Sequence, residues 1–555
     1  MPGPTERQRM QQRWGALKNE RSTWFDHWRE ISEYVLPRSG RFFVTDGNRD
    51  TRRYNRIIDN TGTRAMRILP AGLMSGMTSP ARPWIRLTTS DPELDESYAV
   101  KKWLADVTRL MLMVFAKSNT YLALHTIYKE LGAFGTSCNF IQDDFKNIIH
   151  NDPLTAGEYA LAVDDRGEVN TVYREFQLTV AQLVAKFGKE ACSVTVRGLY
   201  DRGALDAWVH VVHVIEPRTD RDPSKRDARN MAWKSCYFEL GANEDRFLRE
   251  SGYKRFPVVA PRWEKGSGNV YGDSPAMEAL GDIKQLQQEQ LRKSQGIDYM
   301  SNPPLQLPTS LKNQDADLLP GGYSYVDMAS PSGGIRTAFD VRLDLNHLLA
   351  DIQDVRSRIN SSFYVDLFMM LANMDTHNMT ATEVAERHEE KLLMMGPVIE
   401  RLHNEALDPL VDVTFASMME ARILPPPPQE LQGRELSVEY ISVMAQAQRA
   451  VATNSIDRYV MSLGQIAQFK PDVLDKFDSD HWADAYGDAL GVDPELIVPG
   501  EKVALIRKQR AQAQQAQQQM AMAQQGADTA QKLGSIDTSK QSALTDATQA
   551  FAGYS

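Results

Sequence analysis

The chain has 555 residues, of which 42% are hydrophobic and 25% charged, values that fit a globular protein of several domains. No run approaches the roughly 18 consecutive apolar residues that cross a bilayer, and the polar N-terminus is unlike a secretory signal, so we expect no membrane association. Cys138, Cys192 and Cys236 lie far apart, which argues against a disulfide framework or a zinc site.

The net charge of −10 is unevenly distributed. Residues 1–90 hold 16 Lys and Arg against 8 Asp and Glu, a balance of +8, which leaves −18 for the remainder. An acidic bulk is poorly suited to tight nucleic-acid binding, which requires neutralisation of phosphates. In the basic end, arginines alternate with acids, which favours a salt-bridged surface over a contact with DNA or an acidic partner. These residues are Arg49, Arg52, Arg53, Arg56, Arg64 and Arg67, with Asp46, Asp50 and Asp59.

The first predicted element is an amphipathic helix over residues 6–36. Trp14, Trp24 and Trp28 follow the spacing of one helical stripe, and Pro37 ends the pattern. Three tryptophans on one stripe predict a large buried face.

Two more stretches of helix are predicted before residue 135. One covers residues 61–77, where Gly72 and Gly76 lie four apart and permit close approach of a neighbouring element. The other covers residues 95–132, with apolar side chains on one side.

Between residues 137 and 265 the apolar period changes to two, which predicts a β-rich module. The turn of its first hairpin is Asp164-Asp165-Arg166-Gly167, and residues 179–189 are expected to form a short helix.

Residues 275–301 and 344–368 are predicted to be helices that flank a stretch rich in Pro, Gly and turn formers. So long an irregular insertion is usually functional, so we expect an antiparallel helix pair with a protruding tip.

An apolar ladder with spacings of three and four covers most of residues 343–413. The helix predicted over 378–422 would be about 60 Å long, typical of a strut, with kinks at Pro397 and Pro409. A proline spacer follows, residues 437–525 are predicted to be wholly helical, and residues 526–555 are predicted to be a mobile tail.

No constellation of catalytic residues is recognised. The nearest sequence to a P-loop, around Gly188 and Lys189, lacks the first glycine and the hydroxyl residue. His210 and His213 lie three apart in a strand-like segment and point to opposite faces, so they cannot bind one ion together. We therefore expect no enzyme activity, no cofactor and no metal site.

Three segments together resemble the head-to-tail connector, or portal, proteins of short-tailed bacteriophages. They are the Trp-striped helix ending in Tyr34-Val35-Leu36-Pro37, residues 59–87 and residues 256–290, where an aromatic-Gly turn opens a polar helix. The resemblance implies an α+β, predominantly helical subunit of a ring, with wing, stem, clip and crown parts.

The resemblance assigns each part of the chain to one region of such a subunit. These are 1–274 wing (1–136 helical, 137–265 β-rich), 275–301 first stem helix, 302–343 clip, 344–368 second stem helix, 369–380 tunnel loop, 381–424 long kinked wing helix, 425–525 crown and 526–555 tail.

The resemblance also implies sites, each of a different kind. The tunnel loop facing DNA would use Met369, Met370, Asn373, Met374, His377 and Asn378. The stem would line the channel with Lys284, Arg292, Lys293, Arg356 and Arg358. The clip would dock terminase and the tail adaptor through Leu311, Lys312, Asn313, Asp315, Tyr323 and Tyr325. The alternative for residues 369–378 is an ordinary helix–helix turn without DNA contact.

The implied partners are eleven further copies in a dodecamer, weakly and non-specifically held double-stranded DNA, the terminase large subunit, a tail adaptor and the major capsid protein. Scaffold or internal core proteins would be further partners. The subunit would assemble in the host cytoplasm and reside at one capsid vertex of the virion. An acidic body suits a conduit, because every phosphate contact adds friction to moving DNA.

Two other classes of protein remain as alternatives to a portal. A coiled-coil scaffold or internal core protein would use the same helical stripes, but it would form filaments or bundles and has little use for a β-rich module. A nuclease subunit of the packaging machinery would need an acidic metal cluster, which the sequence does not contain.

Overall fold

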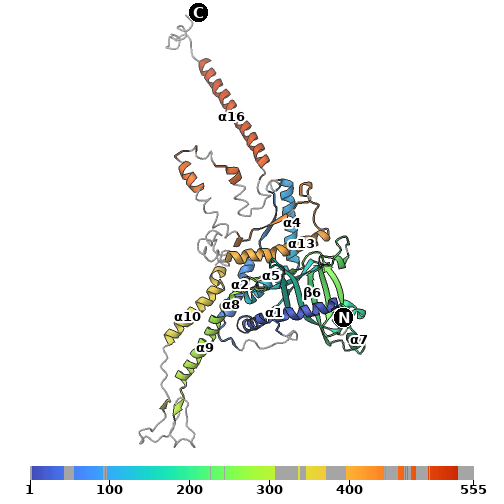
Figure 1. The fold of residues 1–555 in the computed structure, drawn as a ribbon. Helices are drawn as coiled ribbons and strands as arrows, with labels where there is room; N and C mark the ends of the chain where they lie inside the picture. Colours follow the sequence, from blue (N-terminus) through green and yellow to red (C-terminus); the bar gives the residue numbers. More distant parts are fainter. Residues whose placement is uncertain are drawn as a thin grey trace. The chain divides into compact units, whose positions relative to one another are not determined.

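The computed structural model confirms a mixed α+β fold dominated by helices (Figure 1). It describes residues 3–42, 56–91, 94, 97–225, 227–242, 244–306, 336–337, 345–369, 395–431, 433–434, 436–442, 444–445, 460–467, 469–470, 472, 477–482, 498 and 500–534. Contacts divide the chain into a large unit, Met1–Asp95 with Trp103–Ser462, and a small unit, Glu96–Lys102 with Leu463–Ser555. No helix in the described ranges is long and apolar enough to cross a membrane.

The N-terminal helix α1, Glu6–Tyr34, buries the predicted tryptophan stripe in part. Trp14 and Trp28 are fully buried, whereas Trp24 is half-buried. The Trp28 indole N–H donates to the backbone carbonyl of Phe134 (3.1 Å), so α1 is anchored by a hydrogen bond as well as by apolar contact.

A five-stranded antiparallel sheet forms the centre of the β-rich module, in the order β4-β5-β6-β7-β8. Helix α1 packs on one face, where Val212 and Val214 are buried; α6 and α7 pack on the other, with Val211. The strands and helices of this layer are β4 (Tyr159–Val163), β5 (Val169–Thr179), α6 (Val180–Phe187), α7 (Val194–Asp201), β6 (Trp208–Pro217), β7 (Trp233–Glu239) and β8 (Arg249–Tyr253).

The predicted hairpin turn and short helix are both confirmed. In the turn between β4 and β5, the N–H of Gly167 donates to the carbonyl of Asp164 (3.1 Å), and φ at Gly167 is +78°. Helix α6 lies within the range predicted for the short helix. A second, three-stranded sheet has the order β3-β2-β9, with β2 Cys138–Asp144, β3 Ile148–Leu154 and β9 Val258–Val259.

The helical structure predicted over 95–132 is confirmed, and it consists of two helices. They are α4, Tyr98–Lys117, and α5, Thr120–Phe134. The side chain of Asn119 between them binds the backbone of Asn151 on β3 twice (2.6 and 2.8 Å). These two hydrogen bonds to a neighbouring strand hold the chain at Asn119, where the helix is interrupted.

The wholly helical crown predicted over 437–525 is also wrong at its start. Residues Leu436–Tyr440 form strand β12, which pairs antiparallel with β1, Ile85–Thr89. Arg86 and Glu439 form an ion pair (2.9 Å) in this ribbon. Strand β12 forms because it pairs with a segment some 350 residues away in the sequence. Its own residues therefore carry no local pattern that distinguishes a strand from a helix.

The close approach predicted at the glycines of helix α2, Thr61–Met77, is confirmed for Gly72, whose backbone lies against a neighbouring side chain. A Cβ built on Gly72 would lie 2.1 Å from Cδ1 of Phe368, a buried residue at the end of the second predicted stem helix. Glycine is therefore required where α2 meets this side chain.

Replacing Gly72 with Ala is expected to destabilise the large unit by about 2 kcal/mol, because the methyl group must displace Phe368. Gly281→Ala is the matched control, since nothing lies within 4 Å of its added Cβ and it sits in a helix; it should be neutral or stabilising. Urea unfolding of the two variants checks this. Equal loss in both would contradict the close approach.

Glu130 is a buried carboxyl on α5. It accepts hydrogen bonds from the hydroxyl of Thr155 (3.0 Å) and from the N–H of Ala156 (3.1 Å). Burial raises the pKa of Glu130 to about 7, although the Ala156 hydrogen bond lowers it. The folded protein therefore holds a proton that the unfolded chain loses near the ordinary value of 4.5.

This proton makes stability depend on pH. As pH rises from 4.5 to about 7, the unfolded state ionises before the folded state does, so Glu130 should lower the free energy of unfolding across that interval. The Glu130→Gln variant lacks this titration. Its free energy of unfolding, relative to that of the wild type, should therefore rise by on the order of 3 kcal/mol between pH 4.5 and pH about 7. Urea unfolding at several pH values measures the difference; a constant difference would contradict the assignment.

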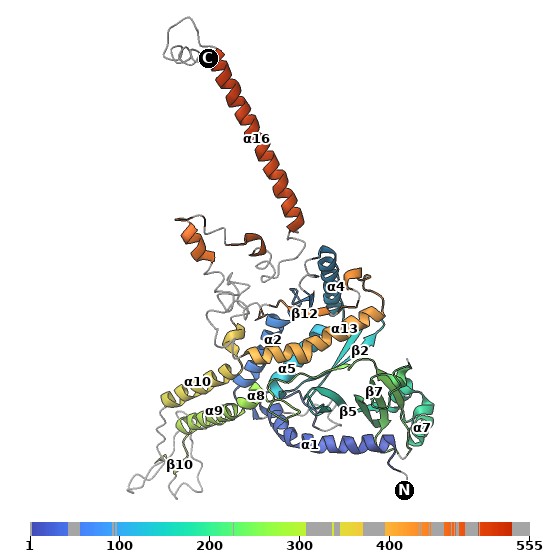
Figure 2. The same cartoon turned by 45° about the horizontal axis from the view of Figure 1, so that its top comes forward.

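The predicted antiparallel helix pair is confirmed. Its first arm is broken at Ala279 into α8, Pro275–Glu278, and α9, Leu280–Ser301; the second arm is α10, Leu345–Ser362. Figures 1 and 2 show α9 and α10 side by side, leading to a short antiparallel ribbon of β10 and β11. These strands are Leu305–Gln306 and Arg336–Thr337.

The long helix after residue 394 is interrupted. Residues 395–402 are helical, His403–Leu407 form a π turn, and α13 continues over Asp408–Glu420. The departure from α geometry comes immediately before Pro409, one of the two predicted kink sites; Pro397 lies in the first described turn. Residues 370–394 lie outside the described residues.

In the small unit, the predicted terminal helix is present as α16, Gly500–Gly534. Arg507 of α16 makes an ion pair with Asp480 (2.5 Å). Helix α16 includes residues 526–534, the first part of the predicted mobile tail; residues 535–555 lie outside the described residues.

Candidate functional site

Three elements meet at the buried carboxylate of Asp59. Its Oδ2 accepts hydrogen bonds from Gln290 on α9 (3.0 Å) and Arg356 on α10 (2.6 Å), while Oδ1 accepts the N–H of Thr61 (2.8 Å). Gln287 on α9 accepts the N–H of Asp59 (2.8 Å) and donates to its carbonyl (2.9 Å). Both arms of the helix pair are thereby tied to the start of α2.

The charge of Asp59 is stabilised by these partners. Burial raises the pKa of its carboxyl, but the hydrogen bonds from Thr61 and Arg356 outweigh that effect and hold the pKa below the ordinary value for aspartate. Asp59 is therefore a carboxylate at neutral pH, and it faces the Arg356 guanidinium in a charge-assisted contact.

This junction was not predicted as a site. The charge pattern groups Asp59 with the interleaved acids of the basic end, and the resemblance groups Arg356 with the channel-lining residues. A signal existed in the sequence, because Gln287 and Gln290 fall on the same α9 stripe as the buried Ile283 and Leu286. Amides at core positions indicate a buried hydrogen-bond network.

Three of the five predicted channel-lining cations have ion-pair partners within the chain. Arg356 pairs with Asp59, Arg358 with Asp282 (3.2 Å), and Lys284 with Glu30. These contacts give the three side chains a structural role between helices.

The other two channel-lining cations, Arg292 and Lys293, have no ion-pair partner among the described residues. Arg292 is exposed and Lys293 half-buried. Of the five, they are the cations that the structure leaves available for a channel contact, which stays a prediction.

Helices α9 and α10 together carry no net charge. Helix α9 carries three acids and three bases, and α10 carries two of each. Burial, and after it the nearby carboxylate of Asp351 on α10, raise the pKa of Glu289 on α9 despite a hydrogen bond from Gln285. The surface of the pair therefore offers no concentrated positive charge to a polyanion.

Large apolar side chains are exposed on both α9 and α10. On α9 these are Leu291, Ile297, Tyr299 and Met300, between 45% and 49% exposed, and on α10 Leu349 is 44% exposed. Meanwhile Ile352, Val355 and Ile359 of α10 are fully buried, as the apolar ladder predicts. The pair thus has apolar surface beyond what its own two helices cover.

Most of the predicted tunnel and clip residues lie outside the described residues. Met369 is described; it is helical and 45% exposed. The tunnel residues Met370, Asn373, Met374, His377 and Asn378 and the clip residues Leu311, Lys312, Asn313, Asp315, Tyr323 and Tyr325 are outside that part of the chain.

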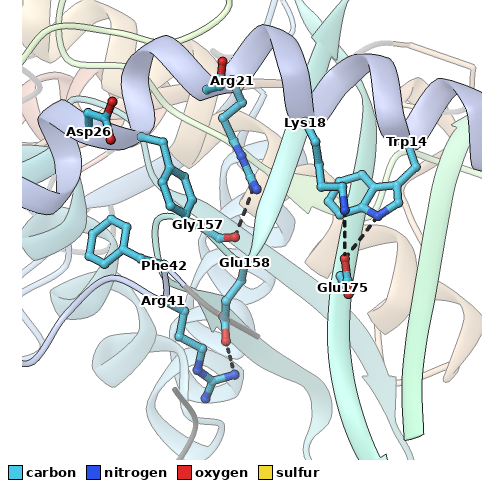
Figure 3. Close-up of a pocket in the computed structure, with 11 residues that line it drawn as sticks. Trp14, Lys18, Arg21, Asp26, Arg41, Phe42, Gly157, Glu158 and Glu175 are labelled. Carbon is cyan, nitrogen blue, oxygen red and sulfur yellow. Dashed lines mark hydrogen bonds and ion pairs between the residues drawn. The ribbon is translucent and has the colours of Figure 1, made fainter. Parts of the chain in front are cut away.

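A pocket of about 440 Å³ lies between α1 and a wall made of Glu175 on β5, Gly157 and Glu158 just before β4, and Arg41 and Phe42 (Figure 3). Figure 3 shows Trp14 and Lys18 both directed at Glu175, at 3.2 and 3.5 Å, and Arg41 paired with Glu158. Lys18 and Arg41 are thus each paired with a carboxylate, which fits a joint between α1 and the sheet.

The histidines of β6 point to opposite faces, as predicted. His213 is buried and stacks on Tyr237 with ring centroids 3.8 Å apart, while His210 is partly exposed beside Glu175 (3.1 Å). Within the described residues, no group of three or more His, Cys, Asp or Glu side chains is arranged to hold a metal ion.

The fold is mixed α+β with a two-helix arm, and the described residues hold no group of side chains arranged for a metal ion. Residues 7–498 match the family described as bacteriophage head to tail connecting protein, and the chain therefore belongs to that family. The predicted resemblance to portal proteins is confirmed, and with it the function of a portal at the head-to-tail junction of the virion.

Two relatives are similar over nearly their whole length. The probable portal protein of Bordetella phage BPP-1 is 68% identical over 100% of both chains. The portal protein of Salmonella phage epsilon15 is 48% identical over 98% of both chains.

Two solved assemblies are similar at a much lower level. A chain of the virion of the native gene transfer agent particle is 10% identical, with a TM-score of 0.34 over 83% of this chain and 98% of that chain. A chain of the neck of the empty particle is 9% identical, with a TM-score of 0.32 over 79% and 91%. Those scores are too low to establish a common fold.

Proposed function

We propose that twelve copies of this chain close into a ring at one capsid vertex, around a channel through which double-stranded DNA enters during packaging and leaves during ejection. The observation that carries the proposal is the exposed apolar surface on α9 and α10. A neighbouring copy would cover it, and a head-to-tail contact that repeats with a fixed rotation closes into a ring.

The neutral helix pair supports a conduit. Net affinity for duplex DNA grows with each neutralised phosphate, so a wall with as many acids as bases lets DNA move with little friction. Arg292 and Lys293 would supply scattered positive rings. We expect isolated rings not to bind duplex DNA with nanomolar affinity.

The family assignment supports a set of proposed partners. Residues 302–343 would form the clip that docks the terminase large subunit during packaging and a tail adaptor afterwards. The major capsid protein, and scaffold or internal core proteins, would be further partners. Assembly would take place in the host cytoplasm, and the ATPase would reside in terminase, because the chain lacks a P-loop.

The predicted tunnel segment tests the channel. Deleting residues 371–377 should leave rings and packaging intact while filled heads lose DNA faster, because the side chains that brush the duplex are gone. A Gly/Ser replacement of the same length separates side-chain contact from loop length. Normal retention in both variants would reject a role for this segment in the channel.

A further inference from the structure

The π turn His403–Leu407 is a one-residue departure from α geometry in the long helix. Its defining hydrogen bond runs from the N–H of Asp408 to the carbonyl of His403. A π turn holds one more residue than an α turn. The residues before it are therefore offset from an uninterrupted helix by one residue step, about 100° of rotation and about 1.5 Å of rise.

One side of the π turn is held by a buried arginine. Arg262 is 2% exposed, and its Nη2 and Nε donate to the two carboxylate oxygens of Glu405 (2.6 and 3.1 Å). The backbone N–H of Arg262 also donates to Glu405 (2.9 Å), and Nη2 reaches the carbonyl of Gly167 (3.0 Å). Glu405 is thus held by a bidentate, charge-assisted contact with Arg262. This contact forms only when the Glu405 side chain leaves the helix on the side that faces Arg262.

The π turn is also held by strand β12. The ring of His403 stacks on the ring of Tyr440 with centroids 3.8 Å apart and planes 4° apart, and the Tyr440 hydroxyl donates to Asp408. Just before the turn, Arg401 donates to the carbonyl of Trp263 (2.9 Å).

We infer that Arg262 and Glu405 are positioning residues that hold the π turn and thereby set the rotational register of the helix before it. The described part of that helix, residues 395–402, follows the predicted tunnel loop 369–380 in the sequence, so the pair would bear on how that loop is presented. This consequence rests on the proposed channel function, whereas the register itself does not. An α turn in place of the π turn would point Glu405 away from Arg262 or shift residues 395–402 by one step.

The test compares two ion pairs on the same long helix. Glu405→Gln removes the buried charge, and Glu405→Ala removes the contact entirely. Glu420→Gln is the matched control, because its partner Lys254 (2.7 Å) also lies outside the helix, but both side chains are exposed and the pair follows the π turn. The readouts are cryo-electron microscopy of assembled rings and hydrogen exchange of peptides covering 395–408.

We expect at least tenfold faster exchange over 395–408 in Glu405→Ala, a smaller change in Glu405→Gln, and a helix before residue 403 rotated by about one residue step. Glu420→Gln should match the wild type. Unchanged register in both Glu405 variants would overturn the inference, as would faster exchange spread evenly over the large unit. Failure of the wild type to form rings would instead overturn the proposed function.

Discussion

Rings are expected to disappear when Ile297 and Met300 are both replaced with Asp. The two side chains are three residues apart on α9 and are 45% and 48% exposed in the single subunit. Covering each by a neighbouring copy contributes about 1 kcal/mol, whereas a carboxylate buried there costs several kcal/mol. Because every interface in the ring carries the change, the ring fraction measured by mass photometry should fall more than tenfold.

The matched control adds the same two charges to the same helix. Gln288 and Gln295 are exposed polar residues of α9, and Gln288→Asp with Gln295→Asp leaves every apolar position intact. This variant should assemble like the wild type. If the Ile297 and Met300 variant assembles equally well, the exposed apolar side chains do not form the contact between copies.

Loss of the Asp59 carboxylate should have the largest effect on the stability of the subunit itself. Asp59→Ala leaves the Arg356 guanidinium and the amide of Gln290 without their acceptor at a buried junction. Removing one partner of such a network costs about 3 kcal/mol. We therefore expect the urea midpoint of the large unit to fall, with loosening of α9 and α10 against α2 visible by hydrogen exchange.

Asp282→Ala is the control for this prediction, because it breaks the partly exposed Asp282–Arg358 pair between the same two helices. That loss should be below about 1 kcal/mol. The pH dependence supplies a further check: a carboxylate whose pKa is lowered by folding stabilises the protein above its ordinary pKa, and this contribution is lost as pH falls below that value. Asp59→Ala should abolish that acid-side loss.

Periodicity revealed the elements whose burial is decided locally. The tryptophan stripe of α1, the hairpin turn at Gly167 and the two arms of the helix pair each follow from spacing within one segment. Close approach at Gly72 was predictable because only glycine admits a neighbour so near the backbone.

The missed features all depend on a partner far away in the sequence. Strand β12 forms because it pairs with β1, and the helix breaks at Asn119 because the side chain of Asn119 hydrogen-bonds to the backbone of Asn151 on β3. Likewise, the site residue Arg356 pairs with Asp59, a contact between residues 297 positions apart. Charge and periodicity within one helix indicate which side chains are polar. They do not indicate whether a polar side chain faces a channel or forms an ion pair with another part of the chain.

Electron microscopy of the purified chain in negative stain tests the central claim most directly, because rotational symmetry is visible in single particles. We predict closed annuli of about twelve subunits with an open centre. Particles that remain single subunits under assembly conditions, or that grow into filaments, would contradict a portal ring built by this chain.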